Sequence, residues 1–68
     1  MDEEKFNLTV RRFLKTFGVT AQREIEKVVD AGMRSGRLRG SETLRARAIL
    51  EIDGLDFATT IEGDIELE

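Results

Sequence analysis

The side chains best suited to chemistry in this sequence are five arginines near the middle of the chain. They are Arg34, Arg37, Arg39, Arg45 and Arg47. A planar guanidinium group binds phosphate through two parallel hydrogen bonds. The cluster therefore predicts a candidate contact surface for an anion or a nucleic acid.

Other kinds of chemistry have few candidates. The sequence has no histidine, cysteine or tyrosine, which removes most general bases and activated nucleophiles. Carboxylates are abundant, but no stretch has the D-x-[DN]-x-[DN]-G spacing of a calcium loop. A chain of 68 residues is also too short to enclose a substrate cleft easily. We therefore expect a non-enzyme with no catalytic, cofactor-binding or metal-binding residue and no small-molecule substrate.

The charges are unevenly distributed along the chain. All eleven Lys and Arg residues lie between Lys5 and Arg47, whereas the chain from Ala48 onward has seven acidic residues and no basic one. Opposite charges in the two halves are expected to attract each other in the folded protein. Single-strand stacking platforms are also missing, because the sequence has no tyrosine or tryptophan. Nucleic-acid binding through the arginines is therefore the weaker alternative.

Two stretches resemble binding motifs only in outline. The segment GRLRG, residues 36–40, could hold an anion with its backbone amides, but it lacks the spacing of a phosphate loop. The segment FGVTAQREIEKVV, residues 17–29, resembles the turn and second helix of a helix-turn-helix. Its exposed side chains carry a net negative charge that phosphate would repel. We therefore expect a turn at 36–40 and, at Gly18, a bend between two packed helices, with an atypical winged-helix-like protein as the alternative.

Two amphipathic helices are expected in the first half of the chain. Gly18 is expected to end the first helix, Thr20 to cap the second, and Gly36 to end the second. The apolar residues of the first helix fall on one face at Phe6, Val10, Phe13, Leu14 and Phe17. Those of the second fall at Ala21, Ile25, Val28, Val29 and Gly32.

The second half changes to the alternating pattern of strands. Asp53-Gly54 predicts a tight two-residue hairpin turn. The apolar face would then pair Ile52 with Leu55, Leu50 with Phe57, Ala48 with Thr59 and Ala46 with Ile61. The other face would pair Arg45 with Glu62, which attract, and Glu51 with Asp56, which repel.

The end of the chain extends beyond this predicted pairing. Ile65 and Leu67 would either enter a short third strand or overhang as an apolar edge that invites another chain. Ile49 would point away from the apolar face. These three residues are our candidates for self-association.

The expected fold is a single small α+β domain over residues 1–68: two helices, then an antiparallel hairpin or three-stranded sheet on which the helices pack. The expected core is Phe6, Val10, Phe13, Leu14, Phe17, Ile25, Val28, Val29, Leu44, Leu50, Ile52, Phe57 and Ile61. A core of this size is marginal, which leaves tight helix packing or self-association as the source of extra stability, with a monomer and a homodimer equally open. Because no apolar run is long enough for a membrane span, we expect a cytoplasmic protein. The small size, the outward Ile49, the apolar strand end at Ile65 and Leu67, and the split charge predict a protein-interaction module whose partner is another protein or a second copy.

The whole chain also resembles a family of short bacterial proteins of unknown function. The matching stretches are FNLTVRRFLK, GVTAQREIEK, GRLRGSETLRARAILEIDGLD and IEGDIELE. The resemblance implies a complete small bacterial protein, and it transfers no activity, cofactor, partner or functional residue.

Overall fold

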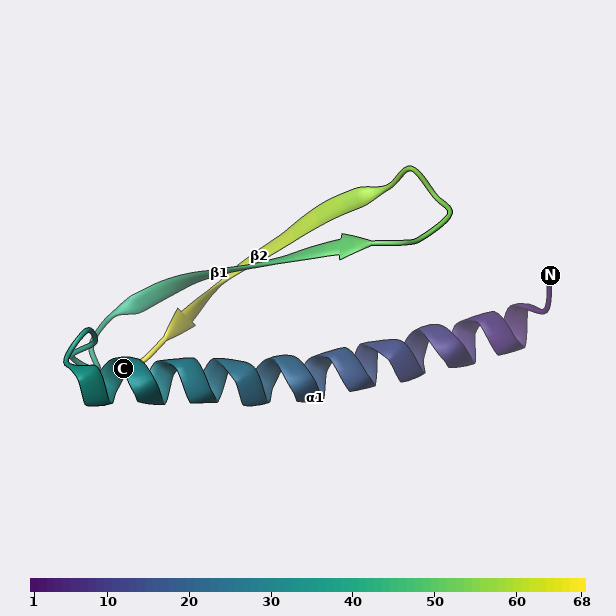
Figure 1. Ribbon diagram of the computed structural model, residues 1–68. Helices are drawn as coiled ribbons and strands as arrows, with labels where there is room; N and C mark the ends of the chain where they lie inside the picture. Colours follow the sequence, from purple (N-terminus) through teal and green to yellow (C-terminus); the bar gives the residue numbers. More distant parts are fainter. The chain divides into compact units, whose positions relative to one another are not determined.

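The computed structural model describes residues 1–68 and has the element order helix, strand, strand (Figure 1). The helix α1 spans Glu3–Ser35, the strand β1 spans Thr43–Glu51, and the strand β2 spans Ala58–Glu66. Two compact units divide the chain, Met1–Arg37 with the helix and Leu38–Glu68 with the hairpin. The expected α+β class is confirmed, as is the antiparallel hairpin.

The helix α1 has strong signals at both ends. Asp2 is the N-cap, and its carboxylate accepts a hydrogen bond from the Lys5 backbone N–H at 3.0 Å. Glu3 and Glu4 follow in the first turn, where the helix dipole favours negative charge. At the other end, Gly36 has φ +82° and donates its N–H to the Met33 carbonyl. The expected stop at Gly36 is thus confirmed.

The prediction of two helices is wrong, because α1 runs through Gly18 and Thr20 without interruption. Gly18 does not adopt the positive φ that a helix stop would require. A glycine inside a helix costs about 1 kcal/mol relative to alanine. Ending the helix there would instead leave backbone groups unpaired at two new termini. The helix-turn-helix and winged-helix interpretations are wrong for the same reason, because residues 17–29 lie within one helix and contain no turn.

The hairpin register differs from the prediction by two residues, so each residue of β1 pairs with a β2 residue two positions later in the chain. Ala48 lies opposite Ile61 and Ala46 opposite Gly63, rather than opposite Thr59 and Ile61. Asp53 and Gly54 do form a turn, in which the Leu55 N–H donates to the Ile52 carbonyl. Only Gly54 has positive φ, whereas a type I′ hairpin turn needs positive φ at both central residues. The chain turns again before β2 begins, where the Phe57 N–H donates to the Leu55 carbonyl at 2.9 Å.

A shift of two residues preserves which side chains share a face. The apolar face still carries Leu44, Ala46, Ala48 and Leu50 from β1 and Thr59, Ile61 and Ile65 from β2. The predicted repulsive pair of Glu51 and Asp56 disappears, because Glu51 now faces Ala58. The hairpin also extends to Glu66, so no third strand forms.

The predicted core does not form within either unit taken by itself. None of its thirteen residues is buried, and Phe6, Phe13 and Leu14 are each more than half exposed. A single helix and a two-stranded sheet each present an apolar face but have no second layer to cover it. The apolar pattern was identified correctly, whereas the burial inferred from it was not.

Candidate interaction surfaces

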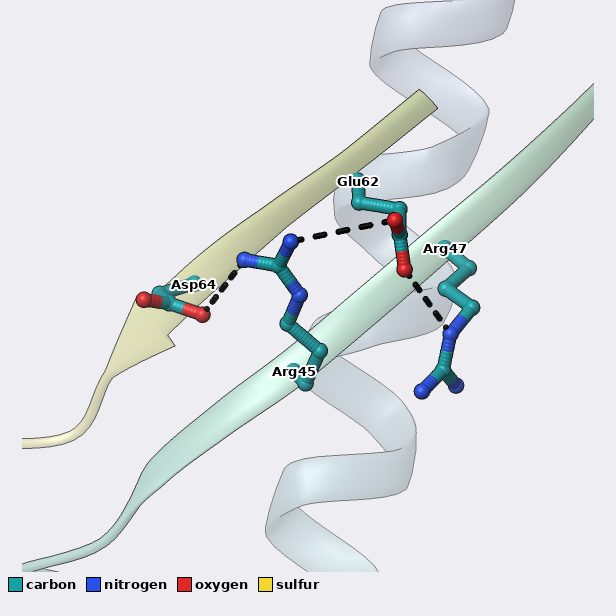
Figure 2. Close-up of polar contacts among 4 residues, drawn as sticks. All are labelled: Arg45, Arg47, Glu62 and Asp64. Carbon is teal, nitrogen blue, oxygen red and sulfur yellow. Dashed lines mark hydrogen bonds and ion pairs between the residues drawn. The ribbon is translucent and has the colours of Figure 1, made fainter. Parts of the chain in front are cut away.

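The polar face of the hairpin carries a network of alternating charges (Figure 2). Arg45 lies between two acids of β2, with Nη1 3.0 Å from Asp64 Oδ1 and Nη2 3.8 Å from Glu62 Oε2. Glu62 in turn accepts a hydrogen bond from Nε of Arg47 at 3.0 Å. The predicted ion pair between Arg45 and Glu62 is present, but it is longer than the ion pair between Arg45 and Asp64. Two of the five candidate anion-binding arginines are therefore neutralised by β2.

The other three candidate arginines lie in the last turn of α1 or follow it in the sequence. Arg34 pairs with Asp30 one turn earlier, with 3.1 Å between Nε and Oδ2. Arg37 and Arg39 are exposed and make no ion pair. Free positive charge in the predicted cluster is thus concentrated at Arg37 and Arg39.

The loop between α1 and β1 does hold an anion, and that anion is a side chain of the protein. The carboxylate of Glu42 accepts backbone hydrogen bonds from Arg39 at 2.9 Å, Gly40 at 2.9 Å and Ser41 at 3.2 Å. Successive N–H groups of this kind form an anion-binding concavity. The hydrogen bond from the Arg39 N–H is the main cause that holds the pKa of Glu42 below its ordinary value. The sequence reasoning recognised the amides but missed Glu42, although a carboxylate just after a glycine turn was the available signal.

The three residues proposed for self-association do not form one patch. Ile49 is 69% exposed and lies on the charged face of the hairpin. Ile65 lies on the apolar face opposite Leu44, and the Leu67 N–H donates to the Glu42 carbonyl. Ile65 therefore pairs within the hairpin and Leu67 bonds to the residue before β1, so this end of the chain does not overhang as we expected.

An extended apolar surface lies on α1 and continues past Gly18, where the sequence pattern predicted a break between two helices. The residues that share this face are Phe6, Val10, Phe13, Leu14, Phe17, Ala21, Ile25 and Val28. Phe13 and Phe17 lie one turn apart with nearly parallel rings, 6.5 Å between centroids. We call this set of eight residues the helix stripe.

Metal-binding clusters and membrane-crossing helices are both absent from the structure. No group of His, Cys, Asp or Glu side chains gathers in a way that could hold a metal ion. No helix combines the length and apolar character that crossing a membrane requires. Within each unit taken by itself, no second layer covers the helix stripe or the apolar hairpin face, and Arg37 and Arg39 have no ion-pair partner.

Comparison with known proteins identifies a family and no closer relative. No curated protein and no solved structure matches the chain. One family model matches residues 1–68, and its description is a family of unknown function, DUF6494. That match covers the whole chain, as the resemblance in the sequence anticipated. The chain therefore belongs to the DUF6494 family of unknown function.

Proposed function

We propose that this protein is a non-enzymatic protein-interaction module that binds another protein chain through the helix stripe. One observation carries the proposal: large apolar side chains are exposed along successive turns of α1, among them Phe6 at 51%, Phe13 at 53% and Val28 at 67%. Contiguous apolar surface of this extent is uncommon on isolated soluble proteins and marks interaction sites. The cytoplasmic location expected from the sequence remains part of the proposal.

The test measures the mass of the fluorescently labelled chain in extract of its source cell by sedimentation velocity. A single chain has a mass of 7.7 kDa, and we expect the wild type to sediment as a larger assembly. Replacing Phe13 and Phe17 together by Gln should return it to the single-chain mass, because both rings leave the interface. Leu8→Gln is the matched control, since Leu8 is 56% exposed and lies outside the stripe. A wild type that sediments as a single chain would contradict the proposal.

A second candidate function is charge-driven binding of nucleic acid at Arg37 and Arg39. It is supported by their exposure without acidic partners. We expect wild-type affinity for mixed-sequence duplex DNA or single-stranded RNA to fall steeply with salt. Replacing both arginines by Ala should flatten the salt dependence by about two units of slope. Arg45→Ala with Arg47→Ala, which removes paired arginines, is the control and should change it less; no binding at low salt would eliminate this function.

A further inference from the structure

Seven residues of the helix stripe, together with Gly32 one turn further on, form a row with a regular spacing. Steps of four, four and three residues connect its members, so the pattern repeats every eleven residues. The row consists of Phe6, Val10, Leu14, Phe17, Ala21, Ile25, Val28 and Gly32. An eleven-residue repeat has about 3.67 residues per turn, close to the 3.6 of a straight helix. The row therefore runs almost parallel to the helix axis for about 40 Å.

Side-chain size changes systematically along this row. The first half carries the large residues Phe6 and Phe17, and the second half carries the small residues Ala21 and Gly32. If two copies lay antiparallel about a point near residue 19, Phe6 would face Gly32 and Phe17 would face Ala21. Val10 would face Val28, and Leu14 would lie near Ile25. Each layer would then hold a similar total volume, as a well-packed interface requires.

From this complementarity we infer that the occupant of the helix stripe is a second copy of this chain, with the two α1 helices antiparallel. The inference rests on the proposed function and names its partner. A parallel pair would crowd Phe6 against Phe6 and leave a gap where Gly32 faced Gly32. It would also bring Glu3 and Glu4 together, whereas the antiparallel pair places them level with Arg34 of the other copy. Opposed helix dipoles favour the same orientation.

The available area is consistent with a stable pair. Phe6 and Phe17 are 51% and 45% exposed, so covering both rings would remove about 200 Å² per copy. A standard interface buries about 800 Å² per partner. Val10, Leu14 and Val28 of the row, at 39%, 53% and 67% exposed, and Phe13 at 53%, offer further apolar area toward this total.

The experiment exploits the absence of cysteine from the chain. Val10→Cys and Val28→Cys variants are mixed in equal amounts in a glutathione redox buffer, and the disulfide-linked species are counted by mass spectrometry. The antiparallel pair predicts that the mixed Val10→Cys–Val28→Cys species exceeds each single-variant species by at least tenfold. The control mixes Leu8→Cys with Asp30→Cys, which lie at matching levels outside the stripe. That mixture should give little cross-linking and no preference.

Three outcomes would overturn the inference. Excess single-variant disulfides would show a parallel pair, and statistical mixing would place the interface elsewhere in the dimer. A purified wild type that sediments as one chain up to millimolar concentration would exclude a second copy as occupant. If the same chain is assembled in cell extract, the proposed function stands with a different protein as partner, so the two failures are distinguishable.

Discussion

The helix α1 and the hairpin each have one apolar face, but they organise their backbones over very different distances. Hydrogen bonds in α1 join residues four apart, and its ends are capped by neighbours at Asp2 and Gly36. The hairpin joins residues seven to twenty-three positions apart, from Glu51 with Ala58 to Thr43 with Glu66. Order in α1 is therefore local, whereas order in the hairpin depends on closing a loop and holding a register.

The two units also treat charge differently. Ion pairs on α1 join residues one turn apart, such as Glu24 with Lys27 and Asp30 with Arg34. In the hairpin, Arg45 and Arg47 pair with acids on the other strand. Charge on α1 therefore adds little to long-range order, whereas charge in the hairpin helps to select the register. Neither unit covers its apolar face, which is the deficit that a partner would remove.

The substitution with the largest expected effect tests whether α1 passes through Gly18 as one unbroken helix. Gly18→Pro should destabilise the folded protein by about 3 kcal/mol, because proline removes a backbone donor and clashes with the preceding turn. Gly18→Ala should stabilise it by about 1 kcal/mol, since an added Cβ meets no atom within 4 Å. Thermal unfolding followed by circular dichroism at fixed protein concentration measures both changes.

The matched control is the glycine that does end the helix. Gly36→Ala should destabilise the protein, because Gly36 has φ +82° and alanine is strained there. If Gly18 were instead a helix stop between two helices, Gly18→Ala would also destabilise. Opposite signs for the two Gly→Ala changes thus separate one helix from two.

A smaller effect is expected in the loop that precedes β1, where the carboxylate of Glu42 accepts three backbone hydrogen bonds. The folded pKa of Glu42 is below its ordinary value, so its hydrogen bonds stabilise the loop above the unfolded pKa of about 4.3. That contribution is lost as pH falls through the folded pKa. In NMR titrations, the amide shifts of Arg39 and Gly40 should move at a pH below that ordinary value, and Glu42→Gln should abolish the movement. A Glu42 carboxyl that titrates at or above the ordinary pKa would contradict its hydrogen bonds to the loop amides. Glu51→Gln is the control, and it should leave the movement of the Arg39 and Gly40 amide shifts unchanged.

Features that depend on residues close together in the sequence were predicted, whereas features that depend on distant residues were not. Apolar periodicity and the stop at Gly36 depend on residues within one or two turns, and both were recognised correctly. Helix continuity was not, because about 1 kcal/mol lost at Gly18 must be weighed against hydrogen bonds on both sides of it. The hairpin faces were predicted, since alternation is local. The register was not, because it depends on the φ angle that Asp53 adopts, and the motif Asp-Gly permits more than one turn.

For the candidate surfaces, the residues could likewise be named from the sequence, but their interaction partners could not. The arginines and the apolar residues were named from composition and spacing alone. Their partners were not, because the register decides that Asp64 lies opposite Arg45 and the loop conformation decides that Glu42 reaches three amides. The residues were thus predictable, whereas the pairings that set which charges stay free required the three-dimensional structure.

The smallest expected effect examines the register directly. Arg45 and Asp64 form an ion pair at 3.0 Å with side chains 51% and 55% exposed, so their coupling should be only about 0.2 to 1 kcal/mol. A double-mutant cycle with Arg45→Ala and Asp64→Asn, measured by thermal unfolding, should give a coupling of this size at low salt and almost none in 1 M salt. A second cycle pairs Arg45→Ala with Glu62→Gln, and a control cycle pairs Arg45→Ala with Asp56→Asn, because Asp56 faces no arginine in this register. In the register with a two-residue turn, Arg45 would face Glu62 directly and Asp64 only diagonally, so the coupling with Glu62 would be the larger. A coupling with Asp64 that exceeds the coupling with Glu62, and none with Asp56, therefore supports the longer loop, because a two-residue slip changes the charged partners while leaving the apolar face intact.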